Sequence, residues 1–355
     1  MKIFSRYIIR NLFLGFAAAA GLLLPLFTTF NLIGELDDVS PDGYRWTQAV
    51  MVVLMTLPRT LIDLGPFIAL LGGIIGLGQL SKSGELTAIR TTGCSIFKIA
   101  IVTLSAGLML IVALGVIDEW IASPMQQQAL QIKMRYSNHD TAGNILWARR
   151  GNVFVTVKSL DAHRQPEGIE LFYYRADHSL QRYIYARTAT ISDNGVWRLE
   201  GVNQKAWANG KETTETKENV VWSSLFGDMS LEELTLPSSS FSVKQLSHYI
   251  SYLKSTGQPS LEFTLALWLK LGHPLLILAM ILLAIPFTFS TPRAPGLGSR
   301  LAVGVIVGLL TYVCDQIIVN LGLLYSLNVQ MTTLAPPILL LAVALILVYR
   351  FDRRP

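Results

Sequence analysis

The stretch Ile96–Gln127, IFKIAIVTLSAGLMLIVALGVIDEWIASPMQQ, passes from a long apolar run into polar sequence within a few residues. Its apolar part, which ends at Ile121, is long enough to cross a bilayer as a helix, since this takes roughly 20 apolar residues. From Met125 to about Pro259 the sequence is typical of a water-soluble, β-rich domain. This change predicts membrane helices joined to one large domain outside the membrane.

The whole chain has the composition of a membrane protein. Of its 355 residues 51% are hydrophobic and only 15% are charged, and its mean hydropathy is +0.44. A soluble domain carries about a quarter charged residues. The expected fold is a polytopic α-helical membrane protein with six transmembrane helices and an inserted all-β, jelly-roll-like domain. The candidate spans are Leu12–Ile33, Ala49–Leu80, Ile96–Ile121, Phe263–Phe289, Leu301–Leu324 and Thr333–Tyr349.

Three segments follow from this pattern. Residues 1–124 are expected to hold transmembrane helices 1–3, with a cytoplasmic helix near residues 83–93. Residues 125–259 hold the β-domain and a connecting helix, and residues 260–355 hold helices 4–6. The first apolar run is expected to be a retained helix, because it begins deep in the chain and lacks a small-residue cleavage site.

The positive charges lie at one end of the predicted helices. Short cytoplasmic segments of membrane proteins are enriched in Lys and Arg, so both termini are predicted to be cytoplasmic and the β-domain to lie outside. The net charge of +5 reflects this bias and does not argue for nucleic-acid binding. The residues concerned are Lys2, Arg6, Arg10, Lys82, Arg90, Lys98, Arg293, Arg300, Arg350, Arg353 and Arg354.

The middle of the chain alternates apolar and polar residues in short runs separated by turn signals. Asp193-Asn194-Gly195 is a hairpin-turn sequence, and an antiparallel sandwich or jelly roll is expected. The predicted strands are Asn152–Val157, Gly168–Tyr174, Arg182–Ile191, Val196–Gly201 and Val220–Leu225. Two interpretations of their aromatic residues stay open: core filling, or an apolar inner face that holds acyl chains. The aromatic residues are Trp147, Trp197, Trp207 and Trp222.

The segment after the strands has helical spacing. Leu246, Ile250 and Leu253 fall on one side of a helix over Ser242–Lys254. It is expected to be a hinge or connecting helix, and a plain linker is the alternative.

Catalytic and metal-binding motifs are absent from the sequence. The chain has no phosphate loop, nucleophile elbow or HExxH zinc motif, and its five histidines are scattered. Cys94 and Cys314 fall in a cytoplasmic loop and in span five, so no disulfide or metal site is expected. The chain is therefore expected not to be an enzyme and to hold no cofactor. Energy for any uphill transport must come from a partner or from an ion gradient.

The cytoplasmic loop Ser81–Gly93, SKSGELTAIRTTG, predicts a two-turn helix. Ser83 is suited to cap it, Glu85 to its positive end and Gly93 to its end. One interpretation is an ordinary connecting loop. The other is a helix that docks on an ATPase, as in ABC transporters, through Glu85, Leu86, Ile89 and Arg90.

Span two carries charges at an unusual depth. As one helix, Ala49–Leu80 would be roughly 48 Å long against a hydrocarbon core of roughly 30 Å. Arg59 would then lie near the outer headgroups, with Asp63 one turn deeper. Arg59 either pairs only with Asp63 or meets an anionic headgroup, because a guanidinium matches phosphate geometry.

Taken together, these motifs resemble the LptF/LptG family of permeases that export lipopolysaccharide, and more strongly its LptG branch. The resemblance covers essentially the whole chain. Its most specific parts are Pro66–Gly72 leading into Ser83–Leu86, Glu119–Ala122, Tyr252–Gln258 and Tyr312–Gln316.

The resemblance implies a multi-pass protein of the bacterial inner membrane with a periplasmic jelly roll. A second, LptF-like permease would face it across a cavity, and an LptB-like ATPase dimer would bind the ATP and Mg. An LptC-like protein would add a single membrane helix and another jelly roll. Lipopolysaccharide would leave the outer leaflet of the inner membrane and pass into a bridge of jelly rolls.

The resemblance also implies residue roles. Glu85 matches the carboxylate of the helix that couples to the ATPase, and Arg59 matches a basic position at the cavity rim. Lys133 falls near another basic position, with Arg135 close by in the sequence. Family members can carry lysines at the outer end of span one. The positions here are Asn31, Asp37 and Asp38, so Arg59, Lys133 and Arg135 would carry more of the phosphate binding, with Asn31 beside them.

Three other functions remain open from the residues alone. One is a permease for another envelope lipid or a lipoprotein. The second is an ion-coupled secondary transporter that uses Asp315 and the Arg59–Asp63 pair. The third is a structural scaffold for envelope β-domains.

Overall fold

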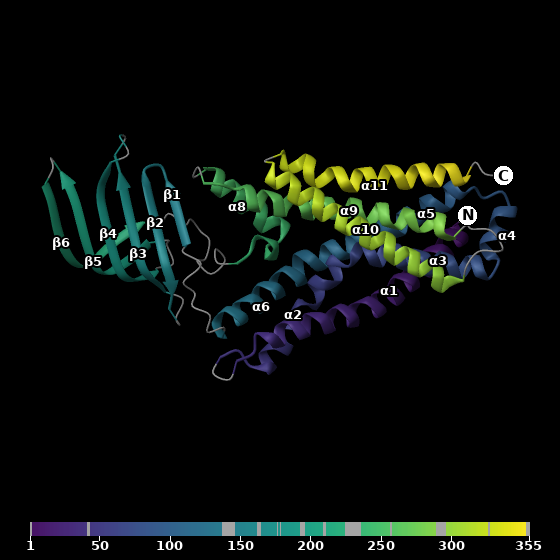
Figure 1. Ribbon diagram of the computed structural model, residues 1–355, viewed down its shortest axis with the longest axis horizontal. Helices are drawn as coiled ribbons and strands as arrows, with labels where there is room; N and C mark the ends of the chain where they lie inside the picture. Colours follow the sequence, from purple (N-terminus) through teal and green to yellow (C-terminus); the bar gives the residue numbers. More distant parts are fainter. Residues whose placement is uncertain are drawn as a thin grey trace. The chain divides into compact units, whose positions relative to one another are not determined.

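The computed structural model describes residues 2–40, 43–136, 146–161, 165–175, 177, 179–191, 196–208, 211–223, 236–255, 258–288, 296–325 and 327–352. The chain forms two compact units (Figure 1). The helical unit comprises Met1–Tyr136, Phe241–Lys244 and Thr264–Pro355. The β unit comprises Ser137–Ser240 and Gln245–Phe263.

The helical unit contains the long apolar helices that the sequence predicts. Among the described residues, five helices are long and apolar enough to cross a membrane, or six if α2 and α3 count as one bent span, which confirms the expected fold class. The N-terminal elements are α1 (Lys2–Asp37), α2 (Trp46–Asp63), α3 (Gly65–Lys82), α4 (Glu85–Thr91), α5 (Ile96–Ile117), the π-helical turn Asp118–Ala122 and α6 (Ser123–Tyr136). The C-terminal ones are α9 (Leu261–Thr288), α10 (Leu297–Leu324) and α11 (Val329–Asp352).

The second span differs from its prediction as one continuous helix. It is broken at Leu64, where α2 and α3 meet at an angle of 63°. Pro66 explains the break, because it has no backbone N–H to donate and disfavours a helical conformation at the preceding residue. Arg59 and Asp63 therefore lie in the last turns of α2 rather than midway along a straight helix.

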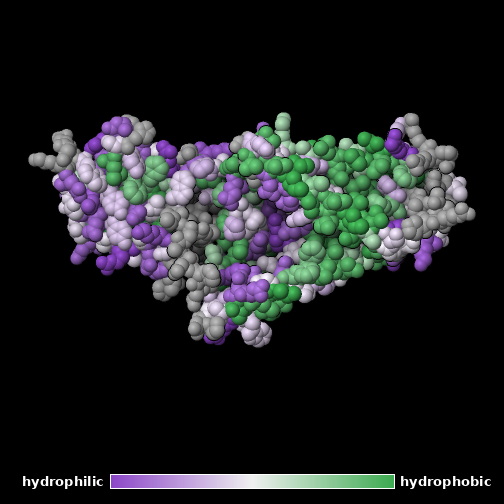
Figure 2. All heavy atoms as spheres, viewed as in Figure 1, coloured by the Kyte–Doolittle hydropathy of each residue, from purple (hydrophilic) through white to green (hydrophobic). Residues whose placement is uncertain are grey.

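Glycines bring α1 and α3 into close contact, as the glycine-rich sequence of α3 predicts. A Cβ atom on Gly15 would collide with the carbonyl oxygen of Gly72, and one on Gly76 would lie 2.7 Å from that of Asn11. Small residues at such a crossing let two helix backbones pack directly on each other. Figure 2 shows apolar residues over much of the viewed surface of the helical unit, as expected of helices surrounded by lipid.

The β unit contains one six-stranded antiparallel sheet in the order β1 to β6. The strands are β1 (Leu146–Arg150), β2 (Val153–Leu160), β3 (Pro166–Tyr174), β4 (Leu180–Ile191), β5 (Val196–Ala208) and β6 (Lys211–Ser223). Helix α8 (Val243–Ser255) buries Leu246, Tyr249, Ile250 and Leu253, which confirms the predicted helix after the strands. The predicted turn Asp193-Asn194-Gly195 lies outside the described residues.

A row of irregular residues crosses the sheet and bends it. Gly168 and Gly201 both have positive φ, of 64° and 63°, which favours glycine. The strand registers place them in one row with Lys158 and Arg187. Residues from both sides of this row share one buried cluster, so a single face of the bent sheet supplies the core. This arrangement is consistent with the expected jelly-roll-like domain.

The tryptophans of the sheet differ in burial. Trp197 is buried in the sheet core, and its ring meets that of Trp222 edge to face at 5.5 Å. Trp147 is exposed. Core filling therefore accounts for Trp197 and Trp222.

Candidate functional site

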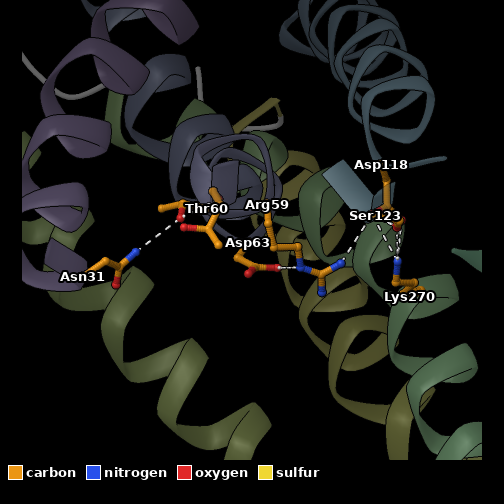
Figure 3. Close-up of polar contacts among 8 residues, drawn as sticks. Asn31, Arg59, Thr60, Asp63, Asp118, Ser123 and Lys270 are labelled. Carbon is orange, nitrogen blue, oxygen red and sulfur yellow. Dashed lines mark hydrogen bonds and ion pairs between the residues drawn. The ribbon is translucent and has the colours of Figure 1, made fainter. Parts of the chain in front are cut away.

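Four charged side chains form a network among α2, the π-helical turn and α9. Arg59 donates from Nε to Asp63, at 3.1 Å, and from Nη1 to Asp118, at 3.3 Å (Figure 3). Lys270 reaches the two carboxylate oxygens of Asp118 from the other side, at 3.1 and 2.8 Å. Ser123 also donates to Asp118, at 3.3 Å. Asp118 thus joins two cations that come from different helices.

The network contains equal numbers of positive and negative side chains, and it is exposed only on the side of Asp63. Two cations face two carboxylates, as expected where charges are removed from water. The side chains of Lys270, Asp118 and Arg59 are 9%, 13% and 18% exposed, whereas that of Asp63 is 57% exposed. An incoming anion would therefore compete with Asp63 for the guanidinium of Arg59 before it reached the buried pair.

The structure extends the predicted Arg59–Asp63 pair. The ion pair is present, and Asp118 and Lys270 enlarge it into a network that sequence reasoning did not assemble. A signal was available for Lys270, because it is a lone lysine in the apolar run of span four. Its partner Asp118 is 152 positions away in the chain, so only the folded helices bring the two together.

Asn31, a predicted lipid contact, also faces α2. Its side-chain amide donates to the hydroxyl of Thr60 at 3.3 Å (Figure 3). Figure 2 shows hydrophilic residues recessed in a hollow of the helical unit, with apolar surface beside it. Asn31 thus contacts α2 at Thr60, the residue next to Arg59.

Lys133 belongs to a second charged group, at the C-terminal end of α1. Its Nζ atom lies 2.9 Å from Glu35 and 2.7 Å from Asp38. Tyr44 donates to Glu35 at 3.1 Å, and burial together with this carboxylate raises the pKa of Tyr44 well above its usual value. Lys133 therefore offsets the acidic residues of span one, although the sequence suggested that it was available for phosphate.

Arg135 lies two residues after Lys133 on α6. It is exposed and makes no ion pair or hydrogen bond with the described residues. Of the three cations predicted to bind lipid, Arg59 and Lys133 are engaged by carboxylates, whereas no carboxylate among the described residues engages Arg135.

The predicted cytoplasmic helix is present as α4, next to the end of α3. Leu86 is 1% exposed and belongs to the core of the helical unit, while Glu85 is partly exposed. Ser83 was expected to cap α4, but its hydroxyl donates to Leu80 and closes α3 instead. Gly84 and Gly93 flank α4 with φ of 77° and 87°, which confirms the predicted role of Gly93.

Three other predicted positions can be placed. Ile89 and Arg90 lie in α4, but their side chains fall outside the described part of the structure. Asp315 is partly buried in α10 and has no hydrogen bond or ion pair to the described residues. Among those residues there is also no group of three or more His, Cys, Asp or Glu that could hold a metal, and both cysteines are free.

Known proteins match this architecture along nearly its full length. The family "Lipopolysaccharide export system permease LptF/LptG" matches residues 6–350. The chain belongs to the LptF/LptG family. It is similar to the lipopolysaccharide export system permease protein LptG of Escherichia coli (strain K12), with 27% identity over 339 residues, or 94% of each chain. The LptG of Haemophilus influenzae is 28% identical over 94% of this chain and 95% of its own.

The LptF/LptG match spans both sets of membrane helices and the sheet between them. Because both named relatives are LptG proteins, the expected likeness to that branch of the family is also confirmed. Membership, together with the apolar helices, makes this chain a multi-pass inner-membrane protein.

Proposed function

We propose that this chain is the LptG-like permease subunit of an ATP-driven lipopolysaccharide exporter. It would take lipopolysaccharide from the outer leaflet of the inner membrane and pass it to a periplasmic bridge of jelly rolls. The family match over residues 6–350 carries this proposal, because it includes both the membrane helices and the β unit that such a route requires. The recessed polar region beside apolar helices suits a lipid with a charged headgroup.

In this proposal both termini are cytoplasmic and the β unit is periplasmic. The N-terminus, the C-terminus and α4 lie at one end of the helical unit (Figure 1). Arg350 lies in the last turn of α11, and Asp352 beside it accepts a hydrogen bond from the backbone of Ile96 at 2.8 Å. Basic residues at this end fit the rule that cytoplasmic segments are rich in Lys and Arg.

The energy would come from a partner. An LptB-like ATPase dimer would bind ATP and Mg and receive α4, while an LptF-like permease and an LptC-like protein would complete the assembly. Glu85 is partly exposed at the start of α4, and Leu86 fixes the helix to the same core as α3. A movement of α4 caused by the ATPase would therefore be transmitted to the membrane helices, because α4 is packed against them.

The lipid phosphate would be met first by Arg59 and Arg135. Arg59 offers a guanidinium whose partner Asp63 is largely exposed, so an arriving phosphate can replace that carboxylate. Arg135 is exposed on α6. Asn31 would add a neutral hydrogen-bond donor, and Lys133 would act chiefly by cancelling the charge of Glu35 and Asp38.

ATP-dependent release of lipopolysaccharide from vesicles tests the proposed function. Vesicles that hold this chain with its second permease, ATPase and LptC-like partner are expected to pass lipopolysaccharide to a soluble jelly-roll acceptor only when ATP is added. Glu85→Ala should insert normally but lose most of this release, because α4 would no longer engage the ATPase. Lys82→Ala, an exposed change at the end of α3, is the matched control and should keep it. Release without ATP, or full release by Glu85→Ala, would contradict the proposal.

A further inference from the structure

The helical unit has two separate hydrophobic cores. The larger core reaches Leu23 of α1 and Ala122, and it also takes in Ile62, with Leu61 packed against it, in the last turn of α2. The smaller one is formed by Tyr44, Ala49, Val52 and Ala129, with Val39, Met55 and Ile132 packed against it. Residues 26–40, 43–63 and 123–136 therefore form a body with its own core, called the arm here. Lys133 further ties α6 to α1 within this arm.

Each helix that enters the arm is irregular close to the same level. α2 and α3 are bent by 63° at Leu64, and the π-helical turn Asp118–Ala122 separates α5 from α6. Within α1, Pro25 removes a backbone hydrogen bond two residues beyond Leu23. Prolines and π-helical turns are common places for helices to bend. These three features therefore place a hinge between the two cores.

The charged network lies where the helices of the arm meet the larger core, beside the apolar contacts of Leu61 and Ile62. Two further polar atoms belong to the arm, the hydroxyl of Thr28 in α1 and the side-chain oxygen of Gln126 in α6. Both atoms are buried and lack a hydrogen-bond partner in the described structure. An unsatisfied buried polar group is unfavourable. Apolar packing alone therefore does not fix the angle of the arm, and the charges of the network contribute to it.

Asp118 connects the arm to α9. It accepts from Arg59 of the arm and from Lys270 of α9, which lies outside the arm. Lys270 also donates directly to Ser123 of the arm, at 3.4 Å. The Arg59–Asp63 pair stays within α2 and crosses no hinge. We propose that the arm turns as a rigid body about this hinge, and that Asp118 is the latch that sets its angle against α9. The latch is a property of the helical unit and does not depend on which lipid is transported.

Spin-label distances across the hinge test this proposal. The labels are placed at Thr47, exposed near the start of α2, and at Met331, exposed at the start of α11, in a full-length chain with Cys94→Ser and Cys314→Ser. Gly272 of α9 packs against α11 near this site, since a Cβ there would lie 3.3 Å from the backbone oxygen of Thr333. The label on α11 therefore reports the position of α9. Distances are measured with the chain in lipid nanodiscs.

Asp118→Asn is expected to lengthen or broaden the measured distance by about 5 Å. An 18-residue helix such as α2 is about 27 Å long, so a turn of about 10° moves its far end by this amount. Asp63→Asn is the matched control, because it removes a carboxylate from Arg59 without cutting a bridge across the hinge. It should leave the distance unchanged.

Two results would overturn the latch. One is an Asp118→Asn distance distribution equal to that of the parent, and the other is the same change in Asp63→Asn, which would make it a general charge effect. If Asp118→Asn does not insert, Lys270→Gln replaces it, because this change cuts only the bridge to α9. An unchanged distance in Lys270→Gln would equally overturn the proposal.

Discussion

Arg59 lies within a long apolar stretch of sequence, and in the structure its charge is paired with two carboxylates. In the sequence it is one cation near an apolar span, and both a structural and a lipid-binding role were open. The structure shows that a structural role exists, because Asp63 and Asp118 both accept from its guanidinium. The proposed lipid contact is compatible with this role, since a phosphate would displace only the exposed Asp63 and leave the bond between Asp118 and Lys270 in place.

Replacing Arg59 with alanine should weaken lipid binding. The loss of one charged hydrogen bond corresponds to about a tenfold lower affinity. Photocrosslinking of lipopolysaccharide from a probe at Thr56, one turn away on α2, measures this change. Asp63→Asn is the control of opposite sign, because it frees Arg59 and should keep or raise the yield. Equal yields from the parent and both variants would return Arg59 to a purely structural role.

Residues with local partners could be placed from the sequence, whereas residues with distant partners could not. Glu85, Leu86 and Gly93 were placed correctly in or beside a short helix, since capping and turn preferences are local. The engagement of Lys133 by Glu35 and Asp38 could not be predicted, because Lys133 and Glu35 are 98 positions apart in the chain. A charge next to an apolar span shows that a partner is needed but does not show which one.

Among the elements, the long helices were predictable and their interruptions were not. An apolar run longer than the bilayer indicates a span, but the same run continues through Leu64, where the chain turns by 63°. Pro66 was the available signal. The first part of β6 was missed because Lys211–Lys217 is almost wholly polar and lacks an apolar alternation, so only pairing with β5 makes it a strand.

The crossing of α1 and α3 gives a prediction at this scale. Gly15→Ala should lower the thermal unfolding midpoint of the purified protein by several degrees, because its Cβ atom would meet the backbone of Gly72. Overpacking of this kind typically costs about 1–3 kcal/mol. Gly21→Ala, two turns along the same helix with open space around it, should be neutral or slightly stabilising. Equal midpoints for the two variants would show that the helices do not cross as tightly as described.

For the whole molecule, one chain supplies membrane helices, a proposed site for a charged lipid and a β unit. The helices and the sheet were expected from hydropathy and alternation. The bend of the sheet at Gly168 and Gly201 depends on a register that joins strands, so no local pattern predicted it. Membership of the LptF/LptG family unites these parts, and we propose that the chain works within a larger assembly.

Native mass spectrometry of the chain, gently extracted from its own membrane, tests this claim most directly. The account predicts one complex that contains a second, related permease, two copies of an ATPase and a mass matching bound lipopolysaccharide. An LptC-like protein should be found in the same assembly. A chain found alone or as a homodimer, with ordinary phospholipid and no ATPase, would contradict the account.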